Sequence, residues 1–127
     1  MALLLDTHVF FWFLSGSQRL SAKHRDMIED GSQKVFVSAV TGWEIAGKVK
    51  LGKWPEAAAR LPDLTAKLLA EGLQTLDLTL AQAEYAGSLP LIHKDPFDRF
   101  LAAQSLLLDM PIVTVDPAFQ LFLCKIA

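Results

Sequence analysis

The chain of 127 residues lacks several features that would assign it to common protein classes. It has one cysteine, Cys124, so an internal disulfide is excluded, and it has no Cys-x-x-Cys pair of the kind that binds zinc. Its three histidines, His8, His24 and His93, do not have zinc-ligand spacing. We therefore interpret Cys124 as a small buried apolar side chain, which is compatible with a reducing cytosol.

The chain also lacks a large excess of charge and a long apolar run. Twelve basic and fourteen acidic residues give a net charge of −2, so nucleic acid would have to be met by local cations. The apolar N-terminus has no basic segment, and Asp6 interrupts it before it reaches the length of a signal sequence or membrane span. We predict a soluble, cytoplasmic protein without membrane contact. Its hydrophobic content of 52% suggests that a partner covers some apolar surface.

Repeats, linkers and low-complexity segments are absent, and strand and helix patterns alternate. This alternation predicts an α/β fold, and the length fits one domain covering residues 1–127. Expected strands are 2–5, 34–37, 75–78 and 112–115, with a weak fifth near 123–126. Expected helices are 8–14, 21–30 with Ser21 as N-cap, 38–50 with Ser38 as N-cap, 55–70, 80–86, and 95–108 with Asp95 as N-cap.

Acidic residues interrupt apolar surroundings at a few places in this pattern. The strands 2–5 and 112–115 each give way to a carboxylate, Asp6 and Asp116, where α/β sheets place their ligands. Glu44 lies within an expected helix, and Asp95 and Asp98 open another. Two carboxylates ~4 Å apart repel by roughly 4 kcal/mol at an effective dielectric constant of 20. A divalent cation with oxygen ligands, Mg²⁺ or Mn²⁺, is the simplest remedy.

Each of these acids also has an ordinary structural interpretation. Asp95 before a proline is a common helix cap, and Asp98 is a favourable charge in a first helical turn. Glu44 could be an exposed helical residue, and Asp6 and Asp116 could be turn residues or caps at strand ends. Their occurrence together favours a common site.

The acids lie in four segments that span nearly the whole chain: 4–8 (LLDTH), 38–48 (SAVTGWEIAGK), 93–104 (HKDPFDRFLAAQ) and 113–119 (VTVDPAF). Each is weak evidence alone, but in this order and spacing they resemble the PIN-domain ribonucleases, specifically the VapC-type toxins of bacterial VapBC toxin–antitoxin pairs. The resemblance implies a three-layer α/β/α sandwich with a mainly parallel sheet of four to five strands. It also implies a metal-dependent endoribonuclease that arrests translation by cleaving RNA.

The same resemblance implies roles for individual residues. Asp6, Glu44, Asp98 and Asp116 correspond to the catalytic acids of the family. We expect Asp6, Asp98 and Asp116 to bind one or two Mg²⁺ or Mn²⁺ ions, whereas Asp95 either shares the metal or only caps its helix. Glu44 either binds metal through water or orients the nucleophile. The neighbouring residues Thr7 and Thr114 are interpreted as ordinary strand-associated threonines rather than as hydrogen-bond partners of the acids.

Local cations and aromatic residues suggest contacts with partners. Lys94 and Arg99 flank the Asp95/Asp98 pair, and Lys48 follows Glu44, so these three are candidates for binding the RNA substrate. By resemblance, the protein forms a homodimer and receives an apolar segment of a VapB-type antitoxin. The aromatic run 10–13, together with Trp43 or Trp54, could face this partner.

Two alternatives compete with this hypothesis. A haloacid-dehalogenase-type enzyme also has an acid after its first strand, but it requires a second acid two residues later, where this chain has His8. A non-catalytic PIN-fold or receiver-like module would act by binding alone. The complete set of acids argues against a degenerate PIN domain, and a receiver would need an acid pair near the first strand.

Overall fold

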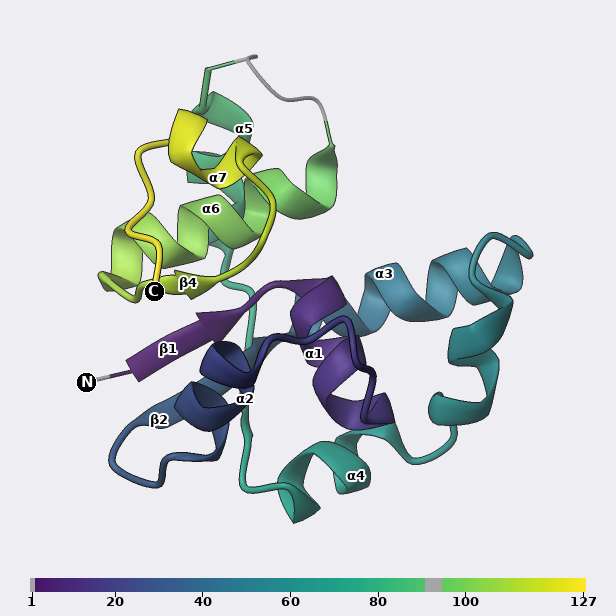
Figure 1. Cartoon of the computed structure of the whole chain (residues 1–127). Helices are drawn as coiled ribbons and strands as arrows, with labels where there is room; N and C mark the ends of the chain where they lie inside the picture. The colour runs from purple at the N-terminus through teal and green to yellow at the C-terminus, as the bar shows by residue number, and fades with distance from the viewer. Residues whose placement is uncertain (1, 91–94) are drawn as a thin grey trace.

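The computed structural model describes residues 2–90 and 95–127, which form one parallel sheet between helices (Figure 1). The strand order is β3-β2-β1-β4, so β1 lies inside the sheet. The elements are β1 (Ala2–Leu5), α1 (Thr7–Ser15), α2 (Ala22–Glu29), β2 (Lys34–Ser38), α3 (Ala39–Lys50), the 3₁₀ helix η1 (Pro55–Arg60), α4 (Leu64–Ala70), β3 (Gln74–Leu76), α5 (Leu80–Ser88), α6 (Pro96–Leu108), β4 (Ile112–Val113) and α7 (Ala118–Leu121).

The apolar residues of β1 separate into the two cores of a three-layer sandwich. Leu3 and Leu5 point into one core, whereas Leu4 points into the other, as the twofold period of a strand requires. All three leucines are buried, and burying each contributes roughly 1.5–3 kcal/mol. In Figure 1, α5, α6 and α7 lie on one side of β1 and β4, and α1, α2 and α4 lie on the other. The predicted α/β sandwich is confirmed.

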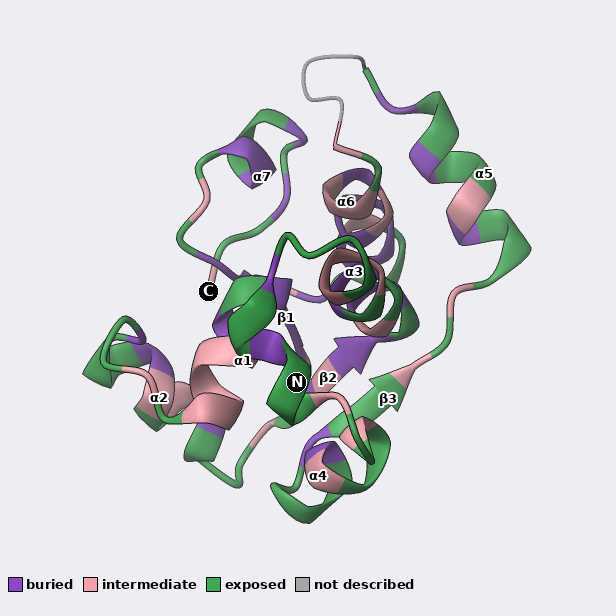
Figure 2. Cartoon of the chain, turned by 90° about the vertical axis from the view of Figure 1, so that its right-hand side faces the viewer, coloured by how far each residue is buried: buried purple, intermediate pink, exposed green. Residues whose placement is uncertain are grey.

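Burial follows the same layers. Figure 2 shows buried residues in β1 and β2 and along the inward side of the helices, while β3 and much of α2, α4 and α5 are exposed. No helix within residues 2–90 and 95–127 is long and apolar enough to cross a membrane.

Parallel pairing brings the carboxyl ends of β1 and β4 together. Leu4 and Leu5 pair with Ile112 and Val113, and the Asp6 amide donates to the Val113 carbonyl over 3.0 Å. The chain runs from β1 to β2 on one side, and β4 lies on the other side of β1. The β1/β4 boundary is therefore a switch point, where sheets of this class bind ligands.

The predicted helix caps agree with the structure. The side chains of Ser21, Ser38 and Asp95 each accept a hydrogen bond from a backbone N–H of the helix that follows. Asp6 acts in the same way for α1, because its carboxylate accepts from the His8 amide. Short polar side chains at these positions satisfy donors that a helix start would otherwise leave unpaired.

The structure corrects the predicted elements in several places. The expected helix 55–70 is divided into η1 and α4, because Pro62 lacks an amide hydrogen and Asp63 adopts a left-handed conformation (φ 57°). The fourth strand is only Ile112–Val113, and the weak fifth strand is reduced to a single bridge between Ile112 and Ile126. The short helix α7 was not predicted.

Arg99 fastens α6 to the end of α5. The residue is 8% exposed, and its guanidinium donates to the carbonyls of Ala86, Leu89 and Pro90 at 2.8, 2.7 and 2.9 Å, and to that of Gly87 at 3.2 Å. A positive charge at the C-terminus of α5 also interacts favourably with the helix dipole. Arg99 thus satisfies carbonyls that the end of α5 leaves unpaired.

We expect Arg99→Ala to lower the free energy of unfolding by about 3 kcal/mol, because it leaves several carbonyls without their charged donor. Urea unfolding followed by circular dichroism measures this change. Arg60→Ala, which truncates an exposed arginine, is the control and should stay within about 0.5 kcal/mol of the wild type. Equal effects of the two substitutions would contradict the anchoring role.

Candidate active site

Asp6 is placed where β1 passes into α1, and its carboxylate is held from two sides. Its Oδ1 accepts from the His8 amide at 3.3 Å, and its Oδ2 accepts from the Thr114 hydroxyl at 2.6 Å. The residue is 5% exposed. The buried strand thus carries a carboxylate into the interior, where two donors fix its orientation.

Burial raises the pKa of the Asp6 carboxyl above its ordinary value of 3.8, because desolvation disfavours the charged form. The hydrogen bonds from Thr114 and from the His8 amide, together with the charge of His8, act in the opposite direction. The negative charge of Glu44 raises the pKa further. Asp6 and Glu44 therefore influence each other electrostatically, although they belong to different elements.

Glu44 points inward from the middle of α3 rather than into solvent. It is 3% exposed, so the interpretation as an exposed helical residue is wrong. Its Oε2 pairs with the Lys48 ammonium at 2.5 Å, one helical turn further on. Its Oε1 is buried and has no hydrogen-bond partner within residues 2–90 and 95–127. Such an oxygen is costly unless a ligand or water satisfies it.

A pair of threonines joins the helices that carry Asp6 and Glu44. The hydroxyls of Thr7 and Thr41 lie 3.0 Å apart, and both residues are buried. Thr41 was not singled out from the sequence. Its position in the sequence could have indicated it, because Thr41 is three residues before Glu44 and therefore lies on the same helical face as Glu44.

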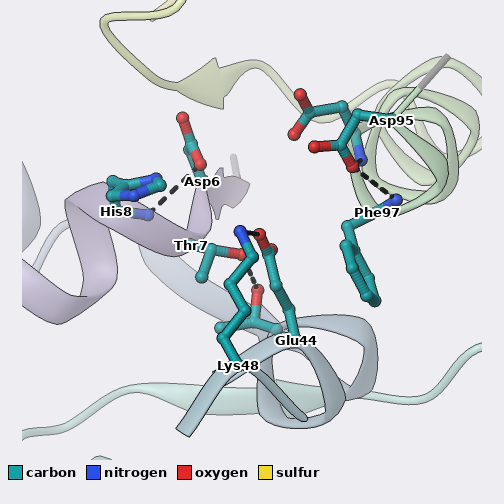
Figure 3. Close-up of polar contacts among 9 residues, drawn as sticks. Asp6, Thr7, His8, Glu44, Lys48, Asp95 and Phe97 are labelled. Atoms are coloured by element: carbon teal, nitrogen blue, oxygen red, sulfur yellow. Dashed lines mark hydrogen bonds and ion pairs between the residues drawn. The ribbon is translucent and has the colours of Figure 1, made fainter. Parts of the chain in front are cut away.

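Asp95 and Asp98 lie at the start of α6. Asp95 caps the helix, because its Oδ1 accepts from the amides of Phe97 and Asp98 at 2.9 and 3.3 Å. Asp98 is half-buried in the first turn. In Figure 3 the side chains of Asp6, Glu44 and Asp95 come from three separate elements and border one region. The cap is therefore established, and it involves only one oxygen of Asp95.

Asp116 follows β4 and is linked to Asp6 through one hydroxyl. The Asp116 amide donates to the Thr114 Oγ1 at 3.0 Å, and the same hydroxyl donates to Asp6. The Asp116 Oδ1 accepts from the Ala118 amide at 2.9 Å and so supports the turn into α7. The interpretation of Thr114 as an ordinary strand-associated residue is wrong, because it orients the Asp6 carboxylate and connects the two acids.

The donor chemistry suits a hard divalent cation, but the acids do not form a compact cage. Among the residues that the structure describes, no three His, Cys, Asp or Glu side chains are close enough to hold a metal ion together. The buried Asp6 carboxylate and the unpartnered Oε1 of Glu44 nevertheless supply oxygen ligands of the type that Mg²⁺ and Mn²⁺ prefer. With water and phosphate completing the coordination, few protein ligands are needed.

The predicted substrate-binding cations have different positions. The structure corrects the prediction that Arg99 binds RNA. Its guanidinium is buried and donates hydrogen bonds to the carbonyls at the end of α5, so it is not presented to RNA. Lys48 lies at the site, but it is paired with Glu44. Lys94 lies outside the described residues, as does His93.

Comparison with known proteins agrees with this fold. The model of the PIN domain family matches residues 3–122. The chain therefore belongs to the PIN domain family. Ribonuclease VapC22 from Mycobacterium tuberculosis is 31% identical over 115 residues, which cover 89% of this chain and 85% of that protein, and the chain is accordingly of the VapC type.

A solved structure supports the architecture independently. The crystal structure of VapBC2 from Rickettsia felis, bound to a DNA fragment from the promoter, contains a chain that superposes with a TM-score of 0.71. The match covers 99% of this chain and 96% of that chain at 16% sequence identity. At this low identity the likeness supports the fold alone.

We expect Mn²⁺ to stabilise the wild-type protein. At a free concentration about one hundred times the Kd, a ligand of the folded state adds about 2.7 kcal/mol to the free energy of unfolding. Asp6→Asn and Asp98→Asn should abolish the stabilisation in a thermal-unfolding titration. Asp26→Asn, which neutralises an exposed acid on α2, should retain it. Equal Mn²⁺ responses in all four proteins would contradict the assignment of Asp6 and Asp98 as ligands.

We also expect Asp6 to make the metal-free protein less stable as the pH rises above about 4. Because its pKa is raised in the folded state, the folded chain keeps a proton that the unfolded chain has lost in this range. The free energy of unfolding of wild type relative to Asp6→Asn should therefore decrease with increasing pH. Urea unfolding in EDTA at a series of pH values tests this, and a constant or increasing difference would refute it.

Proposed function

We propose that this protein is a Mg²⁺- or Mn²⁺-dependent endoribonuclease, the toxin of a type II toxin–antitoxin pair, that arrests translation by cleaving RNA. The observation that carries the proposal is the meeting of Asp6 and Glu44 beside the switch point of a PIN-domain sheet. Both carboxylates are buried, and one oxygen of Glu44 has no hydrogen-bond partner in the part of the chain that the structure describes. A fold without a ligand at this place gains nothing from such costly burial.

We assign the acidic side chains the following roles. Asp6, Asp98 and Asp116 would hold the cation, with Asp95 as a further candidate ligand. When bound, the divalent ion supplies an activated water and offsets the charge that develops on the attacked phosphate. Glu44, through its Oε1, would either orient the attacking water or accept its proton.

Two residues prepare this arrangement. Thr114 keeps the Asp6 carboxylate in a fixed orientation, since its hydroxyl donates to Oδ2 over 2.6 Å. The Lys48 ammonium balances Glu44 while the substrate is absent and lies where it can attract a phosphate group. Because the net charge of the chain is −2, such local cations have to bring RNA to the acids.

Similarity to a VapBC complex supports a proposal about partners. VapBC2 of Rickettsia felis is described together with promoter DNA, and we propose that this chain likewise has a VapB-type antitoxin. Half-buried aromatic residues of α1 and Trp43, which is 68% exposed, offer apolar surface for the antitoxin and for a homodimer contact. We place the whole chain, residues 1–127, in the cytoplasm as one PIN domain, where its RNA substrates occur.

We expect the purified protein to cut total RNA into discrete fragments in Mg²⁺ or Mn²⁺ and to stop cutting in EDTA. Glu44→Gln and Asp98→Asn should each slow cleavage by about a hundredfold or more, because each removes a group that acts on the reacting phosphate or its water. Gel analysis of end-labelled RNA gives both the rates and the cleavage positions.

Asp26→Asn is the matched control and should cleave like the wild type. Circular dichroism should show that all variants remain folded. If the folded wild type binds Mn²⁺ but leaves every RNA intact, or if the two active-site variants cleave as fast as the wild type, the nuclease proposal fails. The first result would favour a non-catalytic PIN-fold module.

A further inference from the structure

A cavity lies next to the acids, between α1 and the segment that follows α3. Its volume is about 440 Å³, within the range of small-molecule sites. His8 connects it to the site, because it is two residues from Asp6, and Lys48 connects it through the ion pair with Glu44. We call this cavity the α1 pocket. Besides His8 and Lys48, its lining consists of aromatic and polar residues: Phe11, Trp12, Ser15, Ser17, Arg19, Lys53, Trp54 and Glu56.

Aromatic rings form one wall of the α1 pocket. His8, Phe11 and Trp12 lie on one face of α1, as their spacing requires. The His8 ring stacks on Trp54, with centroids 5.0 Å apart and an interplanar angle of 27°, and Phe11 lies 4.9 Å from the same indole. Trp54 is buried, whereas His8 is exposed and Trp12 is half-buried. The wall is therefore rigid underneath and accessible on its outer side.

Positive charge borders these rings. Arg19 and Lys53 are exposed at the pocket, and Lys48 is half-exposed, whereas Glu56 is the one acid among the described lining residues. This excess of cations stands out in a chain whose net charge is −2. The Lys48 ammonium also lies 5.9 Å from the centroid of Trp54. Aromatic rings combined with cations are the features that proteins use to bind single-stranded nucleic acid.

We infer that the α1 pocket binds an unpaired nucleotide of the RNA substrate, next to the phosphate that is cleaved. The base lies against the outer faces of His8 and Trp12, and Arg19 and Lys53 contact the adjoining phosphate. Lys48 stands between this nucleotide and Glu44, which places the next phosphate toward the acids. The inference rests on the proposed nuclease function and adds to it the recognition of a base outside a duplex.

The chemistry of the pocket favours RNA over an apolar protein segment. A second cavity, of about 340 Å³ between α3 and α6, is lined by Trp43, Phe97, Phe100 and other apolar residues, and no charged residue is among its described lining. The α1 pocket differs from it by its three cations. Charge complementarity therefore points to an anionic occupant.

The contribution of the cations can be tested with Arg19→Gln/Lys53→Gln. The probe is a fluorescein-labelled oligouridylate, titrated by anisotropy in EDTA at several salt concentrations. Losing two phosphate contacts should raise the Kd about tenfold and reduce the slope of log K against log salt by about 1.4. The control, Lys34→Gln/Lys125→Gln, removes equal charge at the other end of the sheet. Lys34 is the first residue of β2, and the backbone carbonyl of Lys125 accepts from the amide of Ile112, the first residue of β4.

The contribution of the rings can be tested separately with an abasic oligomer of the same charge and length. His8→Ala and Trp12→Ala should weaken binding of the oligouridylate about tenfold each and leave binding of the abasic oligomer unchanged. In a Trp43→Phe background, the oligouridylate should quench the fluorescence of the remaining tryptophans, Trp12 and Trp54, and the abasic oligomer should not. A merely structural role of these rings would not distinguish the two probes.

Each outcome separates this inference from the nuclease proposal. Unchanged affinity of the pocket variants, in a protein that still cleaves RNA, would overturn the nucleotide site and leave the pocket to a protein partner. Base-dependent binding that is lost in the pocket variants would support the site even if the wild type cleaved no RNA, and only the nuclease proposal would then fail. Equal losses in the pocket and control double variants would also overturn the inference.

Discussion

The burial of the Asp6 carboxylate at the end of an inner strand is the constraint on which the rest of the structure depends. Removing a carboxylate from water is unfavourable unless donors replace the solvent. Pairing of β4 with β1 brings the Thr114 hydroxyl to Oδ2, and the start of α1 brings the His8 amide to Oδ1. The sheet order and the first helix start are thus both tied to this single charged group.

Glu44 shows how the fold tolerates a second buried acid. Its pair with Lys48 neutralises the charge from the side that is open to solvent, since the lysine side chain is 31% exposed. The other oxygen has no hydrogen-bond partner among the described residues. A complete set of hydrogen bonds to Glu44 would stabilise the folded chain more. The incomplete set is therefore consistent with selection for function at the expense of stability.

The sequence predicted those features that depend on near neighbours in the chain. Continuous apolar runs predicted β1 and β2, because strands covered on both faces need apolar residues at every position. Ser21, Ser38 and Asp95 predicted helix starts, because capping acts over two or three residues. Where a local signal was overlooked, as at Pro62, the prediction failed although the information was present.

The parts that the sequence did not predict depend on contacts across the fold. Arg99 looked like a substrate ligand beside an acid, but the packing of α5 against α6 turns it toward carbonyls nine to thirteen residues earlier. Thr114 gained its role only because β4 pairs with β1 and places it against Asp6. For the acids, the sequence located the elements, but it could not establish which oxygens are used by caps and which are not.

The last residues of the chain also change how the sheet can meet other molecules. The backbone of Lys125 and Ala127 bonds to both polar groups of Ile112, so the β4 edge is already covered by the protein's own tail. The opposite edge, β3, is three residues long, and two of them are exposed and polar. Short or covered edges resist the addition of a foreign strand and the aggregation that follows from it. Partners of this protein should therefore approach its helices rather than extend its sheet.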